Sequence, residues 1–176
     1  FAEINMSIVQ DLDLWKQTNR VDSYGSELFR FKDRKGHEFC LGATAEELIT
    51  KIVKDHYNGS KINLKVFQIN QKYRDELRAR AGLVRAKQFT MKDAYSFHCS
   101  EDEMKATYMV VKQAYLRIFK RLGLSVVIEA SDAGEIGGAF SEEFLVKSAY
   151  GEGDSSLMEV GHIFQLGTTY SEKMDL

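Results

Sequence analysis

Side chains suited to binding a nucleotide are concentrated between Lys72 and His98, in the segment KYRDELRARAGLVRAKQFTMKDAYSFH. Alternation along a predicted strand places Arg74 and Glu76 on one face, and Phe89 lies in a second predicted strand. A guanidinium that forks onto a phosphate, a carboxylate and a ring that stacks on a base together suit a purine nucleotide. From the residue types alone, however, a surface hairpin with solvated charges is the favoured interpretation.

A hairpin is the element expected to position these side chains. The pattern predicts a first strand over 72–76, a loop over 77–85 and a returning strand from 87–93 that ends at His98. The loop is basic, with arginines at positions Arg78, Arg80 and Arg85.

The same segment resembles the second signature motif of class II aminoacyl-tRNA synthetases, in the form found in bacterial-type prolyl-tRNA synthetases. The matching pieces are YRDE, RARAGLVR and KQFTMKDAYSFH, which together are far more specific than a short glycine pattern. Three further segments resemble the proline-recognition loop, the stretch after the central helix and the strand closing the amino-acid pocket: FKDRKGHEFCLGATAEELIT, GLSVVIEASDAGEIGGAFSEEF and MEVGHIFQLGTTYSEKM. The resemblance therefore covers nearly the whole chain.

Thr44 has two interpretations. With Glu47 three residues later it forms the pattern of a capping box, followed by apolar residues at helical spacing. The sequence alone favours this cap. The resemblance implies that Thr44 and Glu46 hold the secondary ammonium of proline, and a cap and a binding site can coexist at one helix entrance. The family commonly reads GPTHEE where this chain has Ala43 and Ala45, which leaves the rigidity of the loop open.

The resemblance also implies a set of substrate contacts. Arg74 is the expected catalytic residue, because it would hold the α-phosphate of ATP where charge builds in the transition state. The residues expected to bind proline are Thr44, Glu46, Arg74, His98, His162 and Phe164. Those expected to bind ATP are Arg74, Glu76, Arg80, Arg85, Phe89 and Thr168, with Glu76 beside the adenine amino group, Phe89 stacked on the ring and Arg80 on the outer phosphates.

Simpler explanations exist for three of these residues. A lone histidine such as His98 is usually structural or solvated. An amphipathic strand explains His162 and Phe164 equally well, because they are two residues apart and share one face.

The order of the predicted strands and helices indicates the fold class. Strands are predicted over 1–9, 62–70 and 158–166, and a capping box at Ser100 begins a long helix that Gly123 ends. The stripe of that helix expected to pack on the core is Met104, Tyr108, Val111, Tyr115, Ile118 and Leu122. Without alternating strands and helices, the expected class is α+β, with a mainly antiparallel sheet flanked by helices, as in class II synthetases.

Length favours about one domain, and residues 1–176 are interpreted as a partial class II catalytic domain. Many family members carry an inserted editing domain where this chain has the short polar connector 148–156. The resemblance further implies that the third motif and the anticodon-binding domain would lie beyond Leu176.

Composition restricts the possible partners. The net charge of −2 and pI of about 6.1 provide no global basic field for nucleic acid, so RNA contact is expected from the local basic loop 74–92. Cys40 and Cys99 fit reduced thiols of an intracellular protein and lack the spacing of a zinc site. No apolar run reaches membrane-spanning length, and no signal peptide is visible.

Proline is absent from all 176 residues, where an average usage of about 5% would give about nine. Ser7, Ala43 and Ala79 stand where the family reads proline. We interpret this absence as the result of engineering or of unusual selection.

The function implied by the resemblance is that of a proline–tRNA ligase core. It would use ATP with Mg²⁺ to form prolyl-adenylate and then charge the acceptor end of tRNA, in the cytoplasm or an organellar matrix. A homodimer is a further option. Two alternatives remain: a non-catalytic synthetase paralogue, and an engineered proline-free fragment that binds amino acid, ATP or a partner protein.

Overall fold

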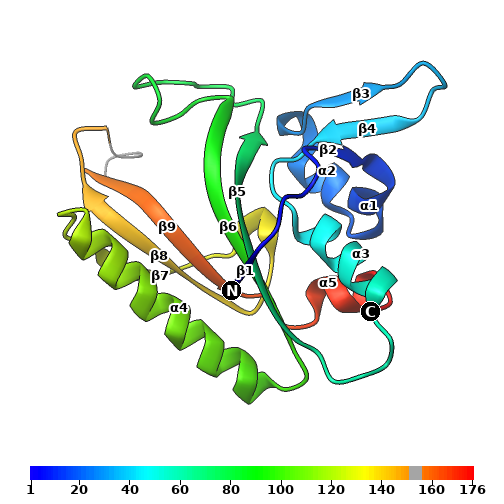
Figure 1. The fold of residues 1–176 in the computed structure, drawn as a ribbon. Coiled ribbons are helices and arrows are strands. Elements are labelled where there is room, and N and C mark those ends of the chain that lie inside the picture. The colour runs from blue at the N-terminus through cyan, green and yellow to red at the C-terminus, as the bar shows by residue number, and fades with distance from the viewer. Residues whose placement is uncertain (151–155) are drawn as a thin grey trace. The chain divides into compact units, whose positions relative to one another are not determined.

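The computed structural model describes residues 1–150 and 156–176. These residues form two compact units, which are described separately below (Figure 1). Unit 1 contains Phe1–Phe97 together with Thr168–Leu176, and unit 2 contains His98–Gly167.

A small antiparallel sheet in the order β2-β4-β3 lies in the first half of unit 1. Its strands and neighbouring helices are β2 (Val9–Asp11), α1 (Leu12–Gln17), α2 (Arg20–Tyr24), the 3-10 helix η1 (Gly25–Glu27), β3 (Arg30–Lys32) and β4 (Glu38–Leu41). Asp11 caps α1 by accepting a hydrogen bond from the Asp13 backbone N–H at 2.9 Å. The Trp15 ring is fully buried, 5.3 Å from the Tyr24 ring, so this part of the core forms around tryptophan.

A second sheet of unit 1 has the order β1-β5-β6. Its strands and the remaining helices of the unit are β1 (Ala2–Glu3), β5 (Asn63–Tyr73), β6 (Gln88–His98), α3 (Glu46–His56) and α5 (Thr169–Lys173). β5 and β6 form the predicted long hairpin, and β1 pairs with β5 in parallel. Ile49 and Val53 of α3 pack with Val66 and Tyr95 of this sheet, which fixes the helix on the hairpin.

Unit 2 consists of one long helix on an antiparallel sheet of order β7-β8-β9 (Figure 1). Its elements are α4 (Glu101–Arg121), β7 (Val127–Ser131), the 3-10 helix η2 (Gly134–Ile136), β8 (Phe140–Lys147) and β9 (Leu157–Gln165). As predicted, Ser100 caps α4, accepting from the Glu103 N–H at 3.3 Å, and Gly123 follows its end with a φ of 74°. Phe144 of β8 is fully buried against Phe119 of α4.

The α+β class with mainly antiparallel pairing is confirmed, although the strands of the described residues are divided among three sheets. The predicted connector 148–156 includes residues 151–155, which lie outside the described residues.

Two local predictions are wrong. Instead of one strand over 1–9, the chain has only the short β1 before β2 begins at Val9. On α4, Ile118 and Leu122 are exposed and Phe119 is buried, because the buried face continues from Tyr115 in a step of four residues.

Candidate active site

Thr44 and Glu46 are in direct contact at the start of α3. The Thr44 hydroxyl lies 2.7 Å from Glu46 Oε1 and 2.6 Å from Oε2, and both residues are buried. The predicted capping box is wrong. Ala45, whose methyl side chain cannot form a cap bond, is the N-cap of α3, and the two groups of the expected box bind elsewhere: the Thr44 hydroxyl is directed to Glu46 and the Glu47 carboxylate to Arg20.

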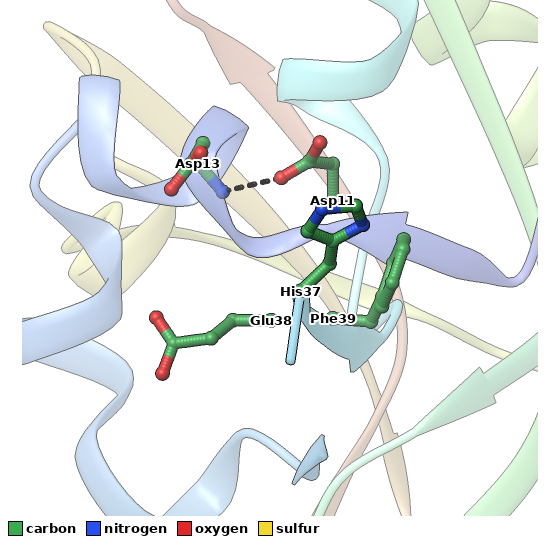
Figure 2. Close-up of a pocket in the computed structure, with 5 residues that line it drawn as sticks. All are labelled: Asp11, Asp13, His37, Glu38 and Phe39. Carbon is green, nitrogen blue, oxygen red and sulfur yellow. Dashed lines mark hydrogen bonds between the residues drawn. The ribbon is translucent and has the colours of Figure 1, made fainter. Parts of the chain in front are cut away.

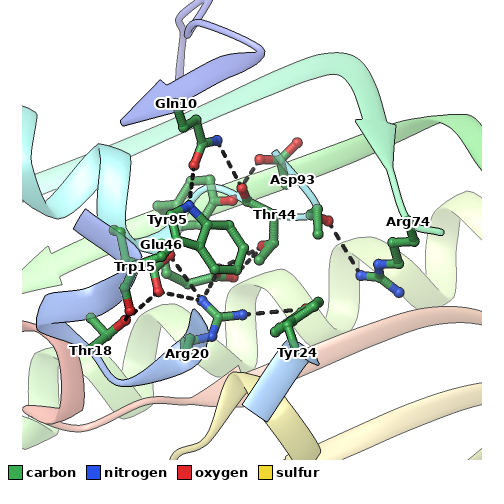
Figure 3. A network of polar contacts seen from close by, with 12 residues as sticks. Gln10, Trp15, Thr18, Arg20, Tyr24, Thr44, Glu46, Arg74, Asp93 and Tyr95 are labelled. Atoms are coloured by element: carbon green, nitrogen blue, oxygen red, sulfur yellow. Dashed lines mark hydrogen bonds and ion pairs between the residues drawn. The ribbon is translucent and has the colours of Figure 1, made fainter. Parts of the chain in front are cut away.

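Gln10 holds the backbone of the loop that carries Thr44. Its Nε2 donates to the Thr44 carbonyl at 3.0 Å, and its Oε1 accepts from the Trp15 indole at 2.8 Å (Figure 3). A Cβ at Gly42 would lie 2.4 Å from Gln10 Nε2, so the approach of this side chain depends on glycine. These buried hydrogen bonds hold the loop in place. They answer the question of its rigidity, which the sequence left open because alanines flank Thr44.

Arg20 joins the two glutamates of α3 in a buried cluster. Its Nη1 lies 3.1 Å from Glu46 Oε2, and 2.9 and 3.0 Å from the two Glu47 oxygens. Glu47 also accepts a hydrogen bond from the Thr18 hydroxyl at 2.7 Å. Burial raises the pKa of Glu47, with Arg20 opposing this effect and Glu46 adding to it. Burial lowers the pKa of Arg20, but the two carboxylates outweigh it and the net shift is upward.

Asp93 is the centre of a second buried network, on the β5–β6 hairpin. It accepts hydrogen bonds from Lys72 Nζ at 2.8 Å, Gln68 Nε2 at 2.8 Å and the Tyr95 hydroxyl at 2.6 Å. Burial, followed by the charges of Glu46 and Asp93, raises the pKa of Tyr95. Tyr95 packs in one hydrophobic cluster with Ala45 and Ile49, so the two buried networks are neighbours within unit 1.

Arg74 lies beside the Thr44 loop. Because β5 ends at Tyr73, the prediction that Arg74 and Glu76 share a strand face is wrong. The guanidinium lies 5.5 Å from the centroid of the Phe89 ring. Its Nη2 is 3.5 Å from the Ala43 carbonyl, and Figure 3 shows Arg74 beside the loop that carries Thr44. Its Nε is buried without a hydrogen-bond partner among residues 1–150 and 156–176. The structure thus brings Arg74 and Phe89 together and leaves one donor of the guanidinium available.

The remaining predicted ATP residues of the hairpin form a short basic loop. Arg85 Nε lies 2.9 Å from Glu76 Oε2, and this hydrogen bond lowers the pKa of Glu76. Arg80 is exposed and pairs with Arg85 through two backbone hydrogen bonds of 3.0 and 3.2 Å. Lys87 and Asp75 form an ion pair in the same segment.

In unit 2, the predicted proline residues His162 and Phe164 are stacked, with ring centroids 3.9 Å apart and an interplanar angle of 21°. Their predicted position on one face of a strand is confirmed. His162 Nδ1 lies 3.3 Å from Glu159 and 3.9 Å from Glu143, and potential ligand atoms of these three side chains all lie within 4.8 Å of one another. Two carboxylates and an imidazole are donors suited to a divalent ion.

The last two predicted site residues, His98 and Thr168, lie at the ends of two secondary-structure elements. His98 ends β6, as predicted, and is partly buried. Thr168 is the N-cap of α5, and its side chain makes no cap bond. Thr168, a predicted ATP contact, belongs to unit 1. The predicted proline contacts are distributed over both units, with Thr44, Glu46 and Arg74 in unit 1 and His98, His162 and Phe164 in unit 2.

A pocket of about 300 Å³ lies beside the start of α1 (Figure 2). Its lining residues are Asp11, Asp13, His37, Glu38 and Phe39. None of them is a predicted site residue, and Lys16 already binds Asp13 at 2.8 Å and Glu38 at 2.9 Å. We interpret this pocket as part of a surface charge network.

Residues 29–176 match the family model described as the tRNA synthetase class II core domain (G, H, P, S and T). The match covers most of the chain. The chain belongs to this family. Among the described residues of this class II core, no helix is both long enough and apolar enough to cross a membrane.

Curated relatives of this class II core include proline–tRNA ligases from bacteria. The chain is 50% identical to the enzyme of Sulfurihydrogenibium sp. over 151 residues, which are 85% of this chain and 27% of that protein. It is 48% identical to the enzyme of Staphylococcus epidermidis over 152 residues, 86% of this chain and 27% of that protein. The chain thus spans 27% of the length of these two relatives.

Solved structures share the fold of the class II core. Giardia lamblia prolyl-tRNA synthetase in complex with prolyl-adenylate has a TM-score of 0.84 at 17% identity, over 99% of this chain and 36% of that one. The Cryptosporidium parvum enzyme complexed with halofuginone and AMPPNP has a TM-score of 0.79 at 14% identity, again over 99% of this chain and 36% of that one. The predicted class II fold is therefore confirmed.

Several residues around the site were not identified from the sequence, namely Gln10, Arg20, Lys72, Asp93 and Tyr95. No local pattern could indicate the role of Arg20, because its carboxylate partners are 26 and 27 residues away. For Lys72 and Asp93 a signal existed: two opposite charges on the inner faces of paired strands predict a buried ion pair.

Proposed function

We propose that this class II core activates proline with ATP and transfers the prolyl group to tRNA, acting as the partial catalytic domain of a proline–tRNA ligase. The names of the bacterial relatives support proline as the substrate, and the adenylate in the Giardia lamblia complex supports the intermediate. The contact between Thr44 and Glu46, with Arg74 beside the same loop, carries the proposal. It offers a carboxylate for a secondary ammonium and a guanidinium for an α-phosphate.

In the activation step, a proline carboxylate oxygen attacks the α-phosphorus of ATP in line, and the bond to pyrophosphate breaks. Arg74 would stabilise the charge that develops on the α-phosphate, using the donor left available at its Nε. Little proton transfer is required, so the protein contributes positioning and charge stabilisation. In the second step a ribose hydroxyl of the tRNA end attacks the acyl carbon, and AMP leaves.

ATP would lie along the β5–β6 hairpin. Phe89 would stack on adenine, Glu76 would accept a hydrogen bond from its amino group, and Arg80 and Arg85 would bind the outer phosphates, with Thr168 as a further contact. Mg²⁺ would share the phosphate charge. In this loop both Asp75 and Glu76 are already paired with cations, so the residues do not form a magnesium site and we place the ion on the phosphates of ATP.

The proline substrate would place its ammonium on Thr44 and Glu46. We propose His98, His162 and Phe164 as further contacts from unit 2. The basic segment 74–92 is the proposed contact for the tRNA acceptor end, and a homodimer and a cytoplasmic or organellar-matrix location would be in keeping with such an enzyme.

Calorimetric titration with a non-hydrolysable sulfamoyl analogue of prolyl-adenylate tests the proposal. We expect the chain to bind the analogue, Glu46→Gln to weaken binding, and Glu3→Gln, an exposed glutamate of β1, to leave it unchanged. A folded chain that does not bind the analogue would contradict the proposal and favour a non-catalytic paralogue.

A further inference from the structure

The guanidinium of Arg20 is enclosed within unit 1. Arg20 is 4% exposed, and its Cζ lies 4.9 to 5.4 Å from three aromatic ring centroids, those of Trp15, Tyr24 and Tyr170. Cation–π contact with three rings stabilises the buried charge and restricts where the guanidinium can lie. Its position is therefore set by the core of unit 1.

One nitrogen of this fixed guanidinium is shared between two carboxylates with different surroundings. Glu47 is fully buried and receives both Arg20 and the Thr18 hydroxyl, so its hydrogen bonds are made within the core. Glu46 receives Arg20 on Oε2 and the hydroxyl of Thr44. Glu47 is thus the fully buried counter-ion of Arg20, whereas Glu46 is the carboxylate that the proposed function assigns to the substrate.

Glu46 needs an external restraint, because its side chain has three rotatable bonds and α3 has no side-chain cap at this end. The Thr44 hydroxyl has only one proton and can donate to one carboxylate oxygen at a time. A second donor on the carboxylate removes the remaining freedom to rotate, and at 3.1 Å from Oε2 the Arg20 Nη1 is placed to be that donor.

We infer that Arg20 is a positioning residue, which orients the carboxylate of Glu46 toward the ammonium of the substrate and is itself held in place by Glu47. The inference rests on the proposed function. It assigns to Arg20 an effect on one part of the substrate only. Loss of Arg20 should weaken binding of the ammonium-bearing ring and leave binding of the nucleotide part intact.

The double variant Arg20→Met with Glu47→Gln separates positioning from folding. It removes one positive and one negative charge, so the net charge of the cluster is unchanged, and Glu46 keeps the Thr44 hydroxyl as a hydrogen-bond donor. Arg20→Lys is a second variant, because it keeps the charge but loses the planar fork. Glu47→Gln alone is a comparison variant, since it keeps the charge of Arg20 beside Glu46 and removes only the carboxylate that holds Arg20 in place. Glu3→Gln, at an exposed position of β1, is the neutral control.

Two probes are titrated into each folded protein: the sulfamoyl analogue of prolyl-adenylate, and the same compound with oxygen in place of the ring nitrogen. We expect the double variant to bind the prolyl analogue at least about tenfold more weakly and the ring-oxygen analogue as wild type does, with Arg20→Lys intermediate. The inference is overturned by equal losses for both probes, by no loss, or by a double variant that does not fold. Wild-type protein that binds neither probe would instead refute the proposed function, and the inference with it.

Discussion

The hydroxyl of Thr44 lies 2.6 Å from a carboxylate oxygen of Glu46, two residues further along the chain. A threonine in a capping box would direct this hydroxyl to the helix backbone, and such a cap stabilises a helix by about 1 kcal/mol. Here α3 begins without any side-chain cap, and the hydroxyl orients a buried carboxylate instead. A local departure from the most stabilising arrangement is typical of a functional site.

Replacing Thr44 by valine should therefore weaken proline binding. Valine keeps the shape but loses the donor to Glu46, and a hydrogen bond to a charged group contributes about 1.5–3 kcal/mol, which corresponds to about 10- to 100-fold in affinity. Titration with the prolyl-adenylate analogue measures the effect, and Thr44→Ser, which keeps the hydroxyl, should bind nearly as wild type does. Equal affinities for the valine and serine variants would refute a role for this hydroxyl.

Glu47 should give the protein a measurable pH dependence of stability. Burial raises its pKa in the folded state, so its stabilising contribution is complete below the ordinary glutamate pKa of about 4.3 and is lost as pH rises through the folded pKa. Glutamine does not titrate, so the variant lacks this pH dependence. The urea midpoint of Glu47→Gln minus that of wild type should therefore increase as pH rises above about 4.3.

Glu38 supplies a control of opposite sign. Hydrogen bonding to Lys16 lowers the pKa of this exposed carboxylate, so its contribution is present above its ordinary pKa and is lost as pH falls. The midpoint of Glu38→Gln relative to wild type should rise on acidification. The same pH trend in both variants would contradict the assignment of Glu47.

The ion pair in the basic loop should be detectable by titration. Arg85→Ala removes the hydrogen bond that lowers the pKa of Glu76, so that pKa should move up toward about 4.3. Carboxyl ¹³C NMR measures the shift. Arg78→Ala is the matched control, because only the backbone N–H of that residue bonds to Glu76. If both variants left the pKa of Glu76 where it is, the pairing with Arg85 would be wrong.

The core of unit 2 should be sensitive at Phe144, which is fully buried and 5.6 Å from the Phe119 ring. Truncation of a buried phenylalanine to alanine costs about 3–5 kcal/mol of unfolding free energy, through lost burial and the cavity left behind. Phe140→Ala removes the same group at a position that is 40% exposed and should cost much less. Urea denaturation followed by circular dichroism compares the two, and similar losses would argue against the described packing.

The long hairpin, the helix over 101–121 and the fold class could be predicted because hydrophobic period and capping residues are local signals. The end of β5 could not be predicted, because charged residues continue past Tyr73 although the strand ends there. Thr44 and Glu46 were found through the resemblance, but the sequence pattern of a capping box gave no indication that these two side chains contact each other. Arg20 was missed because burial of an arginine depends on rings and carboxylates supplied by distant elements, which no local window contains.

Proline-dependent exchange of labelled pyrophosphate into ATP is the most direct test of the account. We predict exchange that requires proline, falls about 100- to 1,000-fold in Arg74→Ala and is unchanged in Arg34→Ala, an exposed arginine of the β3–β4 turn. No proline-dependent exchange by the folded wild-type chain, or exchange that Arg74→Ala leaves intact, would contradict the claim that these residues activate proline.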